Sequence, residues 1–194
     1  MQTTSLRELT NEKHKRAERS KLVHRMLKGA MTEKQYYEYL SNQLMAYYIL
    51  ETYADYKKLF EGIEPIKRAT NISNDLRELE QKHGFETIMI TDATKHYIDY
   101  IQDISADSDK LLAHVYVRHM GDLSGGQIIK RYVPGSGTYY DFSEDVNGLK
   151  EKLRSKLNDS MAEEANKCFD MIYEMFEELE ENFNDVGSTN KTQR

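Results

Sequence analysis

Hydrophobic positions recur at spacings of three and four residues along most of the chain, as they do on one face of a helix. The helical pattern covers residues 5–28, 33–60, 75–83, 94–104, 109–133, 143–157 and 161–183. Only residues 87–90 alternate in the manner of a strand, and weakly. Two prolines and ten glycines in 194 residues leave few breakers. The pattern predicts an all-α, single-domain helical bundle over residues 1–185, followed by a disordered polar tail at 186–194.

Residues typical of helix ends support these boundaries. Three segments have the capping-box pattern, in which a side chain satisfies the first free amides. They begin at Ser5, Thr32 and Ser160. Glycines stand where helix C-termini are expected, at Gly29, Gly62 and Gly84.

The chain has no apolar stretch near the ~20 residues needed to cross a bilayer, and its N-terminus lacks the apolar core of a secretory signal. Cys168 is the single cysteine, so an intrachain disulfide is impossible and a reducing compartment is the natural one. In an apolar helix we expect this thiol to lie in the core. These features favour a soluble, cytoplasmic protein without a membrane partner.

Charge is distributed unevenly around a net value of −6. Seven basic residues lie between positions 12 and 28: Lys13, Lys15, Arg16, Arg19, Lys21, Arg25 and Lys28. Ten acidic residues and one basic residue, Lys167, lie between positions 159 and 185. Both clusters are explained equally well by solvated helix faces and by a docking surface. The acidic net charge disfavours a nucleic-acid partner.

A narrow polar stripe marks the first predicted helix. Arg7, Asn11, His14 and Glu18 fall within about 40° of one another at 100° per residue. An imidazole beside a carboxylate is typical of an axial iron ligand, because the carboxylate fixes the tautomer. Arg7 is placed to hold an anionic substituent of such a ligand. The alternative is an ordinary solvated face.

Three glycines interrupt an otherwise helical stretch at Gly121, Gly125 and Gly126. Each costs up to ~1 kcal/mol relative to alanine, so something must offset them. A flat ligand lying against bare backbone is one explanation, with Asp122 as the carboxylate beside it. Close helix packing or a break between two helices is the other.

Lys150 and Arg154 lie one turn apart on a later helix. Paired cations on one face are able to clamp two carboxylates. A solvated basic face remains the alternative.

Together these segments resemble the haem oxygenases. Residues 113–127 (AHVYVRHMGDLSGGQ) resemble the distal-helix signature of that family. Residues 6–14 (LRELTNEKH) with Ala17 and Glu18 resemble its proximal helix, and residues 168–179 (CFDMIYEMFEEL) its last helix. The resemblance covers residues 5 to 183 and implies the helical bundle of that family.

The resemblance also implies residue roles. His14 matches the iron ligand and Glu18 its hydrogen-bonding partner. Asp122 matches the carboxylate that organises water near the iron. The flexible distal helix over the haem face matches Gly121, Gly125 and Gly126. The hydrogen-bond network of this distal helix matches Arg118, Tyr47 and Tyr97. The propionate-binding positions match Arg7, Lys150 and Arg154, and a pocket-wall aromatic matches Phe169.

The implied activity is oxidative cleavage of haem b, which is both cofactor and substrate, to biliverdin, carbon monoxide and ferrous iron. It uses O2 and external electrons. The chain has no nucleotide-binding glycine loop, so we expect an acidic electron donor such as ferredoxin to dock on the basic cluster. A bilin reductase is the downstream partner that the resemblance suggests. The chain lacks the C-terminal hydrophobic anchor of membrane-bound relatives, which points to the soluble bacterial, algal or phage-like type.

Two positions depart from the family pattern. Ile172 stands where some relatives have a polar residue, so the distal water chain is expected to differ. His119 lies off the glycine face, and we expect it to form hydrogen bonds or lie at the surface rather than ligate iron. The alternative functions are a non-catalytic haem carrier, a haem-free thiaminase-like enzyme or di-iron protein, and a structural adaptor. The chain has one Glu-x-x-His motif where a di-iron bundle needs two.

Overall fold

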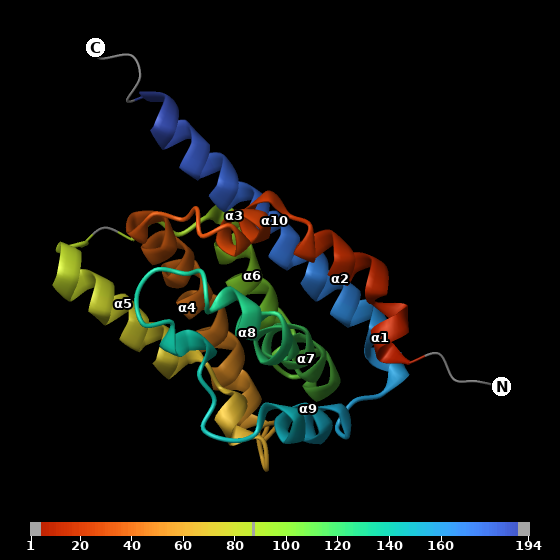
Figure 1. Cartoon of the computed structure of the whole chain (residues 1–194). Helices are drawn as coiled ribbons and strands as arrows, with labels where there is room; N and C mark the ends of the chain where they lie inside the picture. The colour runs from red at the N-terminus through yellow and green to blue at the C-terminus, as the bar shows by residue number, and fades with distance from the viewer. Residues whose placement is uncertain (1–4, 87, 190–194) are drawn as a thin grey trace.

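The computed structural model describes residues 5–86 and 88–189, with side chains described as far as residue 185. This part of the chain is helical and contains no strand (Figure 1), as the hydrophobic pattern predicts. The elements are α1 (Leu6–Leu9), α2 (Asn11–Glu18), α3 (Lys21–Leu27), α4 (Glu33–Tyr56), η1 (Glu64–Ile66), α5 (Ala69–His83), α6 (Asp92–Asp103), α7 (Ser108–Ser124), α8 (Gly126–Ile129), η2 (Thr138–Tyr140), α9 (Val146–Arg154), η3 (Asp159–Met161) and α10 (Ala162–Thr189).

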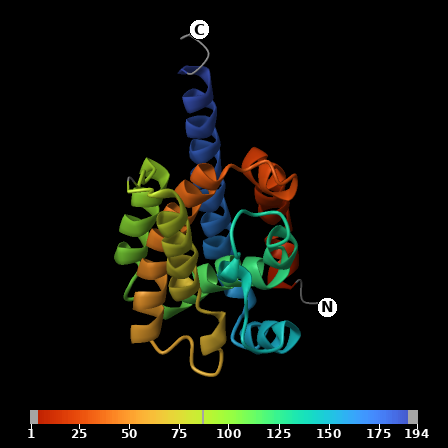
Figure 2. The same ribbon diagram turned by 60° about the vertical axis from the view of Figure 1, so that its left-hand side comes forward.

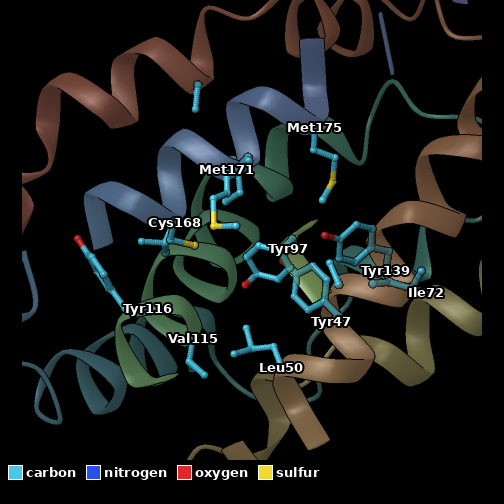
Figure 3. Packing of buried hydrophobic residues seen from close by; sticks show 14 of the residues in the cluster. Tyr47, Leu50, Ile72, Tyr97, Val115, Tyr116, Tyr139, Cys168, Met171 and Met175 are labelled. Atoms are coloured by element: carbon cyan, nitrogen blue, oxygen red, sulfur yellow. The ribbon is translucent and has the colours of Figure 1, made fainter. Parts of the chain in front are cut away.

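Two long helices organise the bundle. α4 packs against α5, α6 and α7, and α10 packs against α2, α3, α6 and α7. In two views 60° apart, the last turns of α10 extend beyond the other helices (Figures 1 and 2). Aromatic and sulfur-containing side chains fill the space between α4, α7 and α10 (Figure 3). Cys168 is among them and is fully buried, so the predicted core position of this thiol is confirmed.

The N-terminal segment is three short helices rather than the single helix predicted over residues 5–28. At Ser20 the backbone is extended, with φ −60° and ψ 151°, and the side chain accepts a hydrogen bond from the Val23 amide. The Thr10 hydroxyl donates to the Leu6 carbonyl at 2.9 Å, where α1 ends. Serine and threonine compete in this way for backbone groups, and the resulting bends lay α2 and α3 along α10.

Several predicted helix ends are confirmed, each of them set by residues of the same helical turn. The capping boxes at Ser5 and Thr32 are both formed. Gly84 ends α5 with a left-handed φ of 67°, and Gly29 follows α3 with φ 62°. The box at Ser160 is wrong: the Asn158 side chain caps a 3-10 turn there and accepts from the Ser160 amide at 3.1 Å.

Several other boundaries differ from the prediction. α4 ends at Tyr56, and Gly62 lies in the turns that follow it. The stretch predicted over residues 109–133 is divided at Gly125 into α7 and α8. α10 continues through residues 186–189, which the tail prediction left outside the helix; extending an existing helix costs far less than starting one. Residues 190–194 lie outside the described residues. Residues 88–90 form no strand, and position 87 also lies outside the described part.

The two charge clusters of the sequence meet in the fold. Lys13 Nζ lies 2.8 Å from both Asp170 carboxylate oxygens, and Arg16 Nη1 lies 3.5 Å from one of them. Arg25 makes a two-pronged ion pair with Glu180 on α10. The basic helices and the acidic helix thus partly neutralise each other, an outcome that neither sequence-based alternative anticipated. Lys15, Arg19, Lys21 and Lys28 are exposed, as is Arg16 despite its contact with Asp170. In the described part of the chain, no helix is long and apolar enough to span a membrane.

Candidate functional site

The predicted distal residues converge where α4 crosses α7. Asp122 lies in the last turns of α7 and is buried. The Tyr47 hydroxyl, on α4, donates to Asp122 Oδ2 at 2.5 Å. The structure therefore brings together two predicted site residues that are 75 positions apart in the sequence.

Burial raises the pKa of Asp122 to about 6. The hydrogen bond from Tyr47 and the charges of His119 and Arg68 oppose this shift, but desolvation is the largest cause. A carboxyl group with a pKa near the pH at which it operates is suited to both accepting and returning a proton.

Arg118 lies one turn before Asp122 on α7 and is also buried. Its Nη1 donates to Gln43 Oε1 at 3.1 Å, and its guanidinium carbon lies 4.1 Å from the centre of the Tyr97 ring. The Tyr97 hydroxyl in turn lies 3.0 Å from His114 Nδ1. Within the described part of the chain, Nε and Nη2 of Arg118 find no atom that meets the geometry of a hydrogen bond. Because buried donors are costly to leave unpaired, these two atoms favour bound water or a polar ligand beside Arg118.

The three glycines have different surroundings. A Cβ placed on Gly121 would meet nothing within 4 Å, and on Gly125 only the Gly121 carbonyl at 3.7 Å. Gly121 therefore faces open space, and at Gly125 a Cβ would make only an ordinary van der Waals contact with backbone of the same helix. Gly126 differs: a Cβ there would lie 2.6 Å from Tyr140 Cδ1. Close packing, in this case of the Tyr140 ring, explains this glycine, and the expectation of bare backbone is wrong at Gly126.

His14 is exposed on α2, with its Nε2 3.3 Å from Glu18 Oε1. The Phe169 ring of α10 meets the His14 ring edge-on, with centroids 5.6 Å apart. One turn of helix brings His14 and Glu18 together, as the sequence stripe predicts. Within this arrangement, a carboxylate is in reach of one ring nitrogen while the imidazole stays accessible to a ligand.

The three predicted propionate-binding cations belong to two elements at the same end of the molecule (Figures 1 and 2). Arg7 is exposed on α1; Lys150 is half-buried and Arg154 exposed on α9, which packs against α7. The structure thus places Lys150 and Arg154 on a helix that packs against α7, and Arg7 on a short helix that packs against α2 and η3.

Tyr139 and Tyr140, near Asp122, were not identified from the sequence, and neither was Gln43, which accepts from Arg118. Tyr139 and Tyr140 are buried in η2, their rings stacked at 4.2 Å, and the Tyr139 ring lies edge-on to Tyr47 at 5.8 Å (Figure 3). No local pattern announced them, because they follow a loop. Gln43 was within reach of prediction, since it lies one turn before Tyr47 on the same helix face.

His119 forms hydrogen bonds, as the sequence predicts, and is fully buried against Glu51. Ile172 is buried in α10, so it adds no polar group to this region.

Comparisons with known proteins agree with one another. Residues 2–178 match the family model described as "Heme oxygenase". The chain is 32% identical to the heme oxygenase of Guillardia theta over 200 residues, covering 90% of this chain and 84% of that protein. It is 33% identical to that of Pyropia yezoensis over 199 residues, with the same coverage. The structure of heme oxygenase-1 from the cyanobacterium Synechocystis sp. in complex with heme superposes with a TM-score of 0.81, at 28% identity and 96% coverage of each chain.

Proposed function

This chain belongs to the haem oxygenase family, and from that premise we propose how its residues hold haem and direct its oxidative opening. The chain is an enzyme that degrades haem. The proposal extends to the products biliverdin, carbon monoxide and ferrous iron, to the use of O2 and external electrons, and to the role of each residue.

The residues present fit a flat, anionic iron macrocycle. An accessible imidazole on α2, open space over Gly121 and two unpaired donors on Arg118 are the features that such a ligand and its waters need. His14 would ligate the iron and Glu18 would orient its ring. Gly121 and Gly125 would let α7 approach the macrocycle without a side chain between them.

Bound haem supplies the iron at which oxygen is activated, and it is also the substrate. Asp122 receives and returns protons through water, which its pKa of about 6 allows. Tyr47 fixes the orientation of the carboxylate through the 2.5 Å hydrogen bond. Arg118 holds water through its two free donors and supplies a permanent positive charge.

Three cations, Arg7, Lys150 and Arg154, would bind the two propionates and would thereby orient the macrocycle. Exposed ion pairs are individually weak, ~0–1 kcal/mol, so their main effect is on orientation.

An external protein supplies the electrons. The fold narrows the predicted docking surface, because Lys13, Arg16 and Arg25 are already paired with α10. Lys15 and Arg19 remain exposed and line a surface hollow of about 620 Å³ between α2 and α10. An acidic one-electron carrier fits this basic surface next to the helix that carries His14. We place the enzyme in the cytoplasm, with a bilin reductase acting on its product.

One observation carries this proposal: the buried Asp122 carboxyl, with a pKa of about 6, lies next to Gly121, whose backbone faces open space. The test is an absorption titration with hemin, followed by reductant under air. A sharp Soret band that gives way to biliverdin absorption is expected. A stable Soret band without biliverdin would instead identify a haem carrier, and spectroscopically free hemin would identify a haem-free helical protein.

A further inference from the structure

An acceptor atom of another residue lies within hydrogen-bond distance of each ring nitrogen of His119. Its Nδ1 lies 3.0 Å from the Val115 carbonyl oxygen, and its Nε2 lies 3.0 Å from Glu51 Oε1. The ring is fully buried, so solvent does not compete for either contact. A carbonyl oxygen only accepts; therefore Nδ1 carries a proton.

The surroundings of Glu51 indicate that its carboxyl is ionised. Its Oε1 accepts from the Arg68 amide at 2.5 Å and its Oε2 from the Ala69 amide at 3.1 Å, at the start of α5. Backbone amides at a helix N-terminus favour the charged form of a carboxylate. An ionised carboxylate has no proton to donate, so Nε2 must also carry one. Both contacts are satisfied only by the doubly protonated, positively charged ring.

The same ring supports the Tyr47–Asp122 pair. It meets the Tyr47 ring edge-on, with centroids 5.2 Å apart, and the Phe60 ring on another side at 5.4 Å. Helix α7 carries His119 and Asp122 three residues apart, which places both on one face. A fixed positive charge thus lies between Glu51 and the site.

We propose that His119 is a positioning residue for the haem-degrading site: held in its charged form by Glu51, it fixes the Tyr47 ring and carries a positive charge on the helix face that holds Asp122. Only one part of this inference rests on the proposed function, namely that Asp122 exchanges protons during turnover. The protonation state of His119 and its effect on Asp122 are properties of the haem-free protein.

The charges around Asp122 agree with this assignment. After burial and the hydrogen bond from Tyr47, the charge of His119 is the next largest influence on the pKa of Asp122, and it lowers that pKa. The other titratable or charged groups that act on this carboxyl come from α4, from the start of α5 and from η2: Tyr36, Tyr39, Arg68, Tyr139 and Tyr140. Arg68 supplies the other positive charge of this set, and it is engaged with backbone carbonyls of residues 65, 66, 139 and 141.

The chain offers a matched control on the same helix. His114 is equally buried and also pairs with a glutamate, its Nε2 lying 2.9 Å from Glu164 Oε1. Its ring contacts two tyrosines of α6, Tyr97 and Tyr100, and it also interacts with Cys168 of α10. Replacing either histidine by glutamine removes one buried imidazole, but only His119→Gln removes the charge near Asp122.

The first experiment needs no variant. Nitrogen NMR of the haem-free protein labelled at histidine should show both ring nitrogens of His119 protonated at pH 7. A neutral tautomer at this position would overturn the proposal, because the positive charge would then be absent.

The second experiment follows the Asp122 carboxyl carbon by NMR titration of the haem-free protein. His119→Gln should raise the pKa of Asp122 from its parent value by about one unit, as expected when a nearby opposite charge is lost; His114→Gln should leave it unchanged. Equal pKa values in the parent and His119→Gln would overturn the proposal, as would equal shifts in both variants. Should His119→Gln not fold, Glu51→Gln removes the anion instead and is expected to raise the pKa of Asp122 in the same direction.

Turnover of the two variants separates this proposal from the proposed function. With haem and a small-molecule reductant, the acidic limb of the pH profile of His119→Gln should move upward with the NMR value. A shifted NMR titration with an unshifted pH profile would uphold the role of His119 and refute the role given to Asp122 in turnover.

Discussion

The hydroxyl of Tyr47 donates to Asp122 Oδ2 at 2.5 Å, inside the bundle and away from solvent. This bond joins α4 to the end of α7 and orients the only carboxylate that lies within the run of three glycines. The same burial that raises the pKa of Asp122 toward neutrality also makes its ionised form costly. The pair therefore links the proposed chemistry to the stability of the fold.

Asp122→Asn should bind haem nearly as well as the parent and form little biliverdin. The amide oxygen still accepts from Tyr47, so the geometry is kept, but the amide does not ionise and therefore cannot take up and release a proton near neutral pH. The Soret band and the biliverdin yield measure the two effects separately. A normal yield would show that this carboxyl is incidental to the reaction.

The same substitution should stabilise the haem-free protein at alkaline pH. Because the pKa of Asp122 rises to about 6 on folding, the folded state holds this proton more tightly than the unfolded state. That stabilising contribution is complete below about pH 4, the ordinary range of aspartate, and is lost as the pH rises through 6. Asp122→Asn, which stays neutral, should raise the free energy of unfolding by about 1–3 kcal/mol at pH 8 and by much less at pH 4.5. Urea denaturation at the two pH values tests this. An equal gain at both would exclude ionisation as the cause.

His14→Ala should leave the fold intact, since the side chain is exposed on α2. Histidine-type haem spectra and turnover should both be lost, and added imidazole should restore part of each by occupying the vacated space. Circular dichroism monitors the fold and absorption spectroscopy the ligation. His24, an exposed histidine on α3, provides the control: His24→Ala should retain the spectra. Unchanged haem spectra in His14→Ala would reject this residue as the ligand.

Lys150→Glu combined with Arg154→Glu should produce mixed biliverdin isomers. Removing either cation alone, as in Lys150→Ala or Arg154→Ala, should weaken haem affinity less than tenfold, because an exposed ion pair is worth ~0–1 kcal/mol. Losing both tethers lets the macrocycle rotate in its plane, so different bridge carbons are attacked. Chromatography of the product distinguishes the isomers. Lys152→Glu, which changes an exposed lysine of the same helix that pairs with Glu144, should leave one isomer. A single unchanged isomer in the double variant would assign regiochemistry to the pocket walls.

Turnover supported by ferredoxin should fall as salt is added, since screening shortens electrostatic steering to ~8 Å near physiological ionic strength. It should fall again in Lys15→Glu with Arg19→Glu. These two cations are preferred over Arg16, whose contacts with Asp170 and with the Tyr173 ring make it part of the fold.

Ascorbate needs no docking surface, so turnover driven by it should change much less in the same variant. Lys34→Glu with Lys110→Glu makes the same change in net charge at exposed positions on α4 and α7. That control should behave as the parent with both reductants. Equal losses with ferredoxin and ascorbate in Lys15→Glu with Arg19→Glu would place the defect in the haem site and refute docking on this surface.

The sequence by itself determined whatever a single helix fixes. Hydrophobic periodicity predicted an all-α chain, and the caps at Ser5 and Thr32 set their own helix starts within three residues. The pairing of His14 with Glu18 followed from one turn of helix. The run of three glycines around Asp122 predicted backbone without side chains, and this backbone is uncovered at Gly121 and Gly125, because the lack of a side chain belongs to the residues themselves.

Only the tertiary structure decided which distant groups meet. α5 starts at Ala69 rather than near residue 75, since the Glu51 carboxylate of another helix binds its first amides. Gly126 is closed by Tyr140, and basic residues of α2 and α3 are neutralised by α10. Helical spacing is set by local backbone geometry and can be read along the chain. Contacts between helices depend on how all side chains fill one core, so no short segment contains the information that specifies them.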